Sequence, residues 1–345
     1  MGSFAANAMV AKTKAIYGTL LKAEDFEELS KKKSVGEIAA YLKNHPDYQE
    51  TLADIQESSI HRGQLEELIK KNNFLHTLKV AKFVELKDKS YYHLNIIHRE
   101  IDLILATIRM LISENIDIAI AEFPTYFIRH ASFDITAFSR VRDYGMLLEA
   151  VKGTKYQAIL EPYFETDRNL IKYSAIEQKL NSHYYDCVFE RIAENYSGSV
   201  RKELEIMFMT RIELANIILA YRLKKFYDAS PDEIENLMDF KHIRTSKKRA
   251  REIIENTDAD GILSFLRDSE YARYADDNDF VYVEYFGDKI RYHLAKKDLY
   301  YSNSAPIVFS AFLIMEEIER QNLFHIIEGI RYGLPESEIR KMLIY

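Results

Sequence analysis

The chain has 345 residues, a formal net charge of −7 and a pI near 5.9, which give no electrostatic reason to expect a nucleic-acid partner. Hydrophobic residues make up 47% of it, enough for a substantial interior, and its 11 glycines and 6 prolines are few, which favours long helices over Gly-rich phosphate loops. A single cysteine, Cys187, excludes an internal disulfide framework and is compatible with a reducing cytoplasm.

The first third of the chain is predicted to be helical almost throughout. Ser34 followed by Glu37 is a capping-box pattern that marks the start of one helix, and Pro46 marks its end. Apolar residues recur at helical spacing from Leu94 to Ile112, as expected for one buried face. The helices expected here cover residues 4–17, 23–29, 34–45, 65–86 and 94–112.

The rest of the chain repeats this arrangement. Ser230 and Glu233 form a second capping-box pattern. The segment Phe280–Phe286, FVYVEYF, has strand propensity, but the matching segments earlier in the chain are helical, so we assign it to a helix. The helices expected here cover residues 134–144, 145–152, 169–195, 200–227, 230–238, 244–255, 260–266, 280–300 and 306–332, with a closing segment at 335–345.

One sequence element occurs three times. Each copy is an acid that precedes a Leu- and Ile-rich helical face: Glu100 in REIDLILATIR, Glu213 in RIELANIILAYR and Glu319 in EIERQNLFHIIEGIR. The copies lie 113 and 106 residues apart, and an asparagine follows three residues after the acid in the second and third copies. The spacing divides the chain into three units of about a hundred residues.

Two further landmarks keep the same order in every unit. One is a hydrophobic residue and a glutamate followed eight residues later by an aromatic residue; its glutamates precede the repeated acids by 34, 36 and 35 residues. Its members are Leu65-Glu66 with Phe74, Ile176-Glu177 with Tyr185, and Val283-Glu284 with Tyr292. The other is an apolar helix that ends in a basic residue and then a tyrosine, at Tyr48, Tyr156 and Tyr271. We therefore interpret the chain as a true triplication.

These patterns predict an all-α protein of three tandem helical units, each a long helical hairpin plus short helices. The predicted units cover residues 1–123, 124–238 and 239–345. The longest apolar stretch, Ala305–Met315, has 11 residues. As a helix it would span about 16 Å, about half of a bilayer core, so we expect no transmembrane span.

Sequence motifs of catalysis and cofactor binding are absent. The chain has no Walker A loop, dinucleotide fingerprint, HExxH or paired CxxC, and its histidines are scattered. Asp276–Asp279 resembles an acidic metal box, but an EF-hand loop counted from Asp277 would need glycine where Tyr282 stands, so we interpret it as a solvated loop. We predict no catalytic residue, no cofactor and no metal, because an all-α enzyme would need clustered titratable groups.

The most basic run of the chain is Lys241–Arg251, KHIRTSKKRAR. It is either an exposed helix face or a docking patch for an acidic protein partner; no interleaved aromatic residues support nucleic acid. The candidate contact residues are Lys241, Arg244, Lys247, Lys248, Arg249 and Arg251.

The repeated acids recur together with arginines. In the first two units an arginine follows the acid by nine residues, about 13.5 Å along one helix, which is too far for a direct pair. The third unit has Glu328 at this position, so the three units should not present identical surfaces. We expect structural ion pairs between neighbouring helices, rather than a catalytic role, for Glu100, Arg109, Glu213, Arg222 and Glu319.

At these landmarks the sequence resembles the C-subunit family of V-type and A-type ATPases, known in eukaryotic V-ATPases as the d-subunit or AC39 family. The resemblance covers nearly the whole chain. It is carried by LLKAEDFEELSKKKSVGEIAAYLKNHPDY, by IELANIILAYRLKKFYDASPDEI and by IERQNLFHIIEGIRYGLPESEIRKML. The Glu-x-x-Asn-Leu/Ile element followed by a Gly-Leu-Pro tail is its most specific part.

This resemblance implies a funnel of three similar helical units around a pseudo-threefold axis. It also implies a non-catalytic adaptor on the cytoplasmic side of the membrane. Its central hollow would receive the central-stalk subunits of a rotary ATPase or ATP synthase, and its narrow face would sit on the cytoplasmic face of the proteolipid ring. The adaptor would transmit torque for proton or sodium transport.

A second reading stays open. A triplicated helical chain is also suited to be a general repeat scaffold for a soluble protein or a nucleic-acid partner. The genes that neighbour its own would separate the two readings, because a rotary ATPase operon favours the adaptor.

Overall fold

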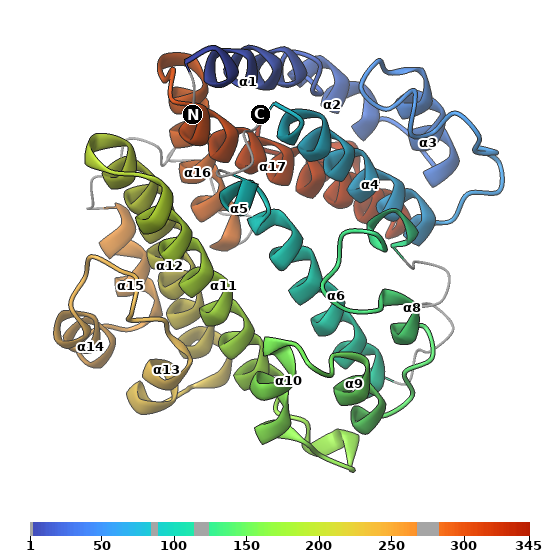
Figure 1. The fold of residues 1–345 in the computed structure, drawn as a ribbon. Coiled ribbons are helices and arrows are strands. Elements are labelled where there is room, and N and C mark those ends of the chain that lie inside the picture. The colour runs from blue at the N-terminus through green and yellow to red at the C-terminus, as the bar shows by residue number, and fades with distance from the viewer. Residues whose placement is uncertain (1–2, 84–88, 114–123, 268–282) are drawn as a thin grey trace. The chain divides into compact units, whose positions relative to one another are not determined.

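A computed structural model describes residues 3–83, 89–113, 124–267 and 283–345, and within these ranges the chain is helical and has no strand (Figure 1). The α-helices are α1 Ser3–Tyr17, α2 Ala23–Ser30, α3 Val35–Asn44, α4 Arg62–Ala81, α5 Lys89–Tyr92, α6 Leu94–Ser113, α8 Ile135–Phe138, α9 Tyr144–Ala150, α10 Lys155–Leu160, α11 Tyr173–Asn195, α12 Gly198–Tyr227, α13 Pro231–Leu237, α14 Lys247–Asn256, α15 Ala259–Arg267, α16 Val283–Tyr301, α17 Ala305–Arg331 and α18 Glu336–Lys341. Short 3₁₀ turns lie at η2 Thr125–Phe127, η3 Glu161–Tyr163 and η4 Arg168–Leu170. The predicted all-α class is confirmed.

Local sequence signals explain several helix starts. The Ser34 hydroxyl accepts from the Glu37 amide at 3.2 Å. At α13 the predicted capping box is complete, because the Ser230 amide donates to Glu233 at 2.8 Å and the Glu233 amide donates to the Ser230 hydroxyl at 3.4 Å. The strand-like segment is helical from Val283 onward, and its first three residues lie outside the described ranges.

Two predicted helices differ in their ends. The helix expected from residue 244 begins at Lys247, because the Ser246 hydroxyl caps it by accepting from the Arg249 amide at 3.3 Å. The long helix expected over 65–86 begins earlier, at Arg62, and ends at Ala81.

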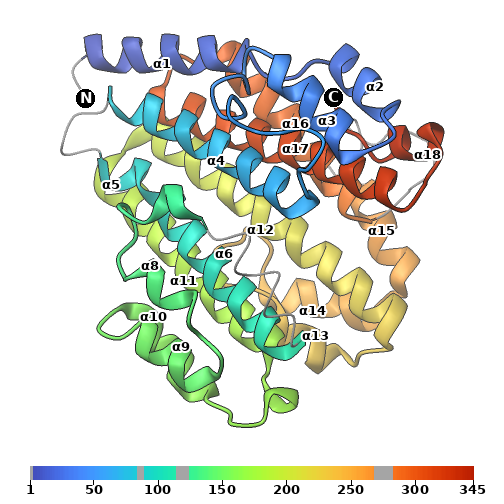
Figure 2. The same ribbon diagram turned by 90° about the vertical axis from the view of Figure 1, so that its right-hand side faces the viewer.

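The chain forms two compact units. The first contains residues 1–86, 198–235 and 243–345, and the second contains 87–197 and 236–242. Helix α17 is the central element of the first unit: α1, α2, α3, α4, α12, α16 and α18 all pack on it, and Figures 1 and 2 show the helix labelled α17 among its neighbours. In the second unit α6 packs along α11, while α9 contacts α6 and α10 contacts α11.

The core of the first unit joins the two ends of the sequence. One of its apolar clusters combines residues 21–69 with the last third of α17, with α18 and with the segment after it. The members from the end of the chain are Leu323, Ile326, Ile327, Ile339 and Leu343. Because these side chains are almost fully buried, the position of α17 should be sensitive to small changes in side-chain volume.

One close approach fixes α18 on α17. A Cβ atom at Gly329 would stand 2.6 Å from the Ile339 Cγ1 atom, so only glycine fits here without movement. Nearby, the Asn322 side chain donates to the Ile344 carbonyl at 2.7 Å and accepts from the Ile344 amide at 3.0 Å. The last helix is therefore held by both shape and hydrogen bonds.

The predicted hairpin of the third unit is present, since α16 and α17 pack along each other and only three residues separate them. In each of the first two predicted units, one long helix of the expected hairpin lies in the first compact unit and the other lies in the second. Those two hairpins and the predicted ranges 1–123, 124–238 and 239–345 therefore stay predictions. In the described part of the chain, no helix is both long and apolar enough to cross a membrane.

Candidate functional site: the repeated acids

The first repeated acid joins α6 to the short helices that follow it. Glu100 is 2% exposed, and its carboxylate accepts from the Tyr156 hydroxyl at 2.6 Å and from the Ser132 amide. Tyr156 is the tyrosine of the landmark that ends in a basic residue and tyrosine. Two sequence landmarks, 56 residues apart, therefore meet in one buried hydrogen bond.

The third repeated acid makes the same arrangement with the start of the chain. Glu319 on α17 is 5% exposed; it accepts from the Tyr48 hydroxyl at 2.7 Å and from the Leu21 amide at 2.8 Å. Tyr48 belongs to the same landmark as Tyr156, but it precedes its acid by 271 residues. The acid at the end of the chain is therefore satisfied by the short helices at its beginning.

The second repeated acid has a cation among its partners. Glu213 on α12 accepts from the amides of Arg244 and Thr245 at 2.7 and 3.0 Å and from the Arg244 guanidinium at 2.7 and 3.0 Å. Tyr271, the tyrosine that corresponds to Tyr48 and Tyr156, lies outside the described residues. In all three sites the acid anchors a backbone amide from a connecting segment.

The position nine residues after each acid makes a second link. Arg222 on α12 pairs with Glu284 on α16 at 3.0 Å. Arg109 on α6 donates to the Tyr173 hydroxyl at 2.5 Å, and that hydroxyl donates to Glu177, also on α11, at 3.1 Å.

The third unit makes this link with the charges exchanged. Glu328 on α17 pairs with Arg62 on α4 at 2.7 Å, and Arg62 also binds Glu66 at 2.6 Å. In each case the link leads to the glutamate of the landmark that includes Phe74, Tyr185 or Tyr292. The recurring contacts therefore join α6 with α11, α12 with α16, and α17 with α4.

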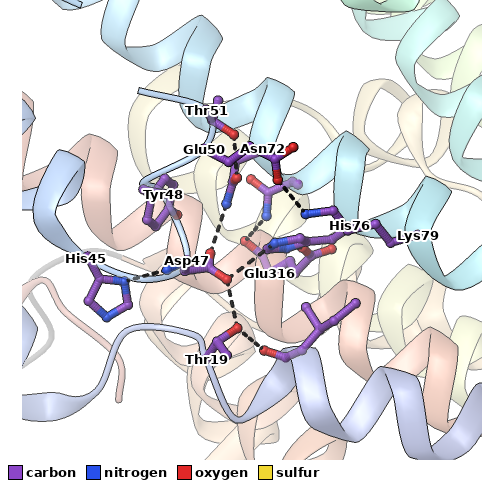
Figure 3. A network of polar contacts seen from close by, with 12 residues as sticks. Thr19, His45, Asp47, Tyr48, Glu50, Thr51, Asn72, His76, Lys79 and Glu316 are labelled. Atoms are coloured by element: carbon purple, nitrogen blue, oxygen red, sulfur yellow. Dashed lines mark hydrogen bonds and ion pairs between the residues drawn. The ribbon is translucent and has the colours of Figure 1, made fainter. Parts of the chain in front are cut away.

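A polar cluster surrounds Glu319 in the first compact unit. We call Asp47, His76, Glu316 and Glu319 the Glu319 cluster; these four side chains are at most 8% exposed. His76 contacts Glu316 at 2.7 Å through Nδ1 and Asp47 at 3.3 Å through Nε2 (Figure 3). One imidazole is therefore buried with three carboxyl groups.

Hydroxyl and amide groups complete the hydrogen bonds of Asp47. Its carboxylate accepts from the Thr19 hydroxyl at 2.9 Å and from the Asn72 side-chain amide at 2.8 Å, and Asn72 in turn accepts from Thr51 at 2.7 Å (Figure 3). The Thr19 hydroxyl also lies 2.7 Å from the Ile16 carbonyl, so its one proton is shared between these two acceptors. The cluster thus connects the end of α1, the segment after α3, α4 and α17.

Burial and like charge determine the protonation of this cluster. Burial, assisted by the charge of Asp47, raises the pKa of Glu319 to about 8, against the lowering effect of its bonds from Tyr48 and Leu21. Burial lowers the pKa of His76, but the bond to Glu316 and the nearby carboxylates outweigh it, so the net pKa is raised. Burial together with Glu319 raises the pKa of Tyr48 well above its usual value.

A third acid of α17 has the opposite surroundings. Glu317 accepts from Arg211 on α12 at 3.2 Å and from Arg291 on α16 at 2.6 Å. Burial alone would raise the pKa of Glu317, but the two arginines, with Arg320 nearby, outweigh it and hold this pKa well below the usual range. Glu317 is therefore ionised and ties three long helices together.

The basic run is largely paired. Lys241 meets Asp186 at 2.5 Å, Lys247 meets Glu235 at 2.5 Å, and Lys248 lies 3.9 Å from Glu252. Arg244 is the partner of Glu213, and Arg251 binds Asp232, Glu235 and Glu255 within 2.9 Å. The most exposed cation among these pairs is Lys248, whose side chain is 88% exposed, and its neighbour Arg249 is also exposed.

The candidate residues are thus partly brought together. Glu213 meets Arg244 of the basic run, whereas Glu100 and Glu319 bind tyrosines. Arg222 binds Glu284 directly, and Arg109 is linked to Glu177 through the Tyr173 hydroxyl. The sequence reasoning missed Asp47, His76, Glu316 and Glu317. A signal was present for Glu316 and Glu317, since these two further acids precede the repeated acid within the mostly apolar helix α17.

Metal binding has no support within residues 3–83, 89–113, 124–267 and 283–345, where no group of three or more His, Cys, Asp or Glu side chains has a geometry that could hold an ion. The acidic box Asp276–Asp279 lies outside these ranges. The contacts of the repeated acids are therefore hydrogen bonds and ion pairs that fasten helices to one another.

Comparison with known proteins gives a family for this arrangement. Over 213 residues the chain is 26% identical to the C subunit of the A-type ATP synthase of Methanosphaera stadtmanae, and the alignment covers 57% of this chain and 53% of that protein. The chain therefore spans about half the length of this curated relative. Residues 9–342 match the family described as ATP synthase (C/AC39) subunit. Because this match covers nearly the whole chain, the protein belongs to the ATP synthase (C/AC39) subunit family.

Proposed function

We propose that this chain is a non-catalytic central-stalk adaptor of a V-type or A-type rotary ATPase or ATP synthase. It would couple the rotating shaft to the proteolipid ring and transmit torque for proton or sodium transport. The single observation that carries the proposal is the family match over residues 9–342. We further propose that three helical units form a funnel with pseudo-threefold symmetry, to which the three sets of equivalent contacts give support.

The internal contacts suit a part that must not twist. Helix α17 is packed by seven other helices, and three of its acids bind different neighbours: Glu316 meets α4, Glu317 meets α12 and α16, and Glu319 meets the first 48 residues. Rotation of α17 about its axis would break all three sets of contacts at once. Such resistance is what torque transmission requires, because a flexible adaptor would absorb the rotation of the shaft.

The proposed partners are the central-stalk subunits and the cytoplasmic face of the proteolipid ring, which would make the protein a cytoplasmic, peripheral part of a membrane-bound complex. The basic run is the proposed contact with an acidic partner. Within it Lys248 and Arg249 are the best candidates, because both are exposed and the ion pair of Lys248 is long. An interface built on exposed charges should weaken as the salt concentration rises.

Pull-down of the purified stalk subunits and of the detergent-solubilised ring tests this proposal. We expect both to be retained at low salt, and we expect Lys248→Glu combined with Arg249→Glu to reduce retention of the stalk. The exposed lysines Lys202 and Lys297 provide a matched control, because reversing both makes the same change of charge elsewhere. If the unaltered chain retained neither partner, the adaptor function would be refuted. The alternative function, a helical scaffold for another soluble partner, would then be favoured.

A further inference from the structure

The attachment of the start of the chain to α17 has an unusual composition. Apolar residues of α2 and α3, such as Phe26, Leu29 and Ile38, pack in one cluster with Leu323 and Ile326 of α17. Beside this cluster, the same two segments are joined by the Glu319 cluster, in which three buried carboxyl groups interact electrostatically and His76 contacts two of them. Hydrogen bonds from Tyr48 and Leu21 to Glu319 run directly between the two segments.

The charged groups around Glu319 come from several elements. Asp47 and Tyr48 lie in the segment after α3, His76 lies on α4, and Glu316 lies one helical turn before Glu319 on α17. On helix α2, which also packs on α17, Asp25 is bound by Tyr41. The arginines of α12 and α16 that approach α17, Arg211 and Arg291, bind Glu317. Among these neighbours, His76 contacts two of the three carboxyl groups of the cluster, those of Asp47 and Glu316, and interacts electrostatically with the third.

We propose that the Glu319 cluster is a protonation-dependent latch that fastens residues 19–52 to α17, and that alkaline pH loosens this attachment. With a proton on Glu319, a neutral acid stands near Asp47 and Glu316, and its bond with Tyr48 is kept. Loss of that proton places a further negative charge inside the protein, beside those of two other carboxylates. This charge destabilises the closed state, in which Glu319 is buried, and not the open state, in which water solvates Glu319.

The direction of the pH dependence follows from the raised pKa values. Glu319 titrates near pH 4.5 when it is open to solvent and near pH 8 when it is closed, so its contribution to closure is complete below the first value and disappears as the pH rises through the second. His76 acts in the same direction, because its pKa in the closed state is also raised. The apolar packing of α2 and α3 is unaffected by pH, so we expect loosening and not dissociation.

Hydrogen exchange of the full-length chain at pH 6 and pH 9, corrected for the intrinsic change of exchange rate, tests the latch. The protection factor of peptides from residues 19–52 should fall at least about tenfold at the higher pH. Between the two pKa values of Glu319, each rise of one pH unit lowers the ratio of closed to open molecules by up to about tenfold. Glu319→Gln keeps the size and an acceptor oxygen but cannot ionise, and it should reduce this fall to the part that His76 contributes. The matched control is Glu100→Gln, which removes the corresponding acid from the second compact unit and should leave the fall in residues 19–52 unchanged.

Two results would overturn the latch: protection of residues 19–52 that is equal at pH 6 and pH 9, or a fall that Glu319→Gln does not reduce. Should Glu319→Gln fail to fold, Glu316→Gln takes its place, because its amide can still bind His76 while one of the opposing charges is gone; it must then show a smaller fall than the unaltered chain. The latch depends only on contacts inside the first compact unit, so it holds or fails independently of the adaptor function.

Discussion

The Glu100 and Glu319 sites have the same bonds in different surroundings. In both, a buried glutamate accepts from a tyrosine hydroxyl and from a backbone amide. Around Glu100 the neighbours of Tyr156 are rings, since Phe133 and His183 both pack edge-on against it. Around Glu319 the neighbours are Asp47, Glu316 and His76.

This difference separates what the repeat preserves from what it varies. The carboxylate–tyrosine bond is kept because it satisfies a buried acid and fixes a short helix to a long one. The shell around it differs: at Glu319, burial and the nearby charges of Asp47 and Glu316 raise the pKa to about 8. Equal geometry therefore does not mean equal response to pH.

The largest effect should come from the acid of α17 that has cationic partners. Glu317→Ala leaves Arg211 and Arg291 without their shared carboxylate and should cost about 3 kcal/mol of unfolding free energy, as expected for a broken, mostly buried ion pair. Because the pKa of Glu317 is lowered in the folded state, the cost should be complete at neutral pH and shrink as the pH falls below about 4. Urea unfolding at several pH values measures it.

A matched variant guards against a general effect of removing acids. Glu284→Ala breaks the exposed pair with Arg222 and should change stability far less than Glu317→Ala. Equal losses in the two variants would contradict the role that we give to burial.

The most direct test of the comparison removes one hydroxyl from each site. Tyr48→Phe and Tyr156→Phe each delete a hydrogen bond to a buried carboxylate and should cost about 2 kcal/mol. The cost of Tyr48→Phe should grow between pH 6 and pH 9, because the ionised Glu319 then loses a donor among other acids. A cost of Tyr156→Phe that rises equally over this range would erase the distinction between the sites.

The Glu213 site should give a smaller loss. Glu213→Gln keeps an oxygen for the amides of Arg244 and Thr245 but removes the charge that holds the Arg244 guanidinium, so we expect about 1 kcal/mol. Thermal unfolding in low and high salt would resolve it. A loss larger than that of Tyr48→Phe would show that the arginine stabilises more than the buried tyrosine does.

The smallest effect is expected at the surface of the basic run. Lys248→Ala should leave the thermal midpoint unchanged, because its side chain is 88% exposed and its pair with Glu252 is 3.9 Å long. A clear drop in the midpoint would mean that this lysine belongs to the fold, which would weaken its use as a probe of the proposed partner contact.

The sequence predicted the parts of the fold that depend on nearby residues. Ser34 and Ser230 cap helices as expected, and Pro46 follows the end of α3. The three repeated acids and their tyrosines were also recognisable as landmarks. Their pairing was not, because Glu319 and Tyr48 are 271 residues apart and nothing local records that a buried acid at one end needs a donor from the other.

The same reason explains the missed residues. His76 and Asp47 look like ordinary polar side chains of a helix and a connecting segment, and they become a cluster only when α4 packs on α17. The alternation of partners on α17 depends on which face of that helix each neighbour covers. Such information belongs to the packing of helices and not to their individual sequences.

The fit of α18 over Gly329 sets a rule for exchanging volumes. An added methyl group at position 329 would collide with the branched side chain of Ile339. A protein with alanine at both positions would have no such collision, but it would bury slightly less apolar surface. In an alignment of relatives the two sites should accordingly trade size, a larger residue at one being accompanied by a smaller residue at the other. Such covariation of residue size would identify, from sequence alone, where the last helix packs on the preceding long helix in other chains of this family.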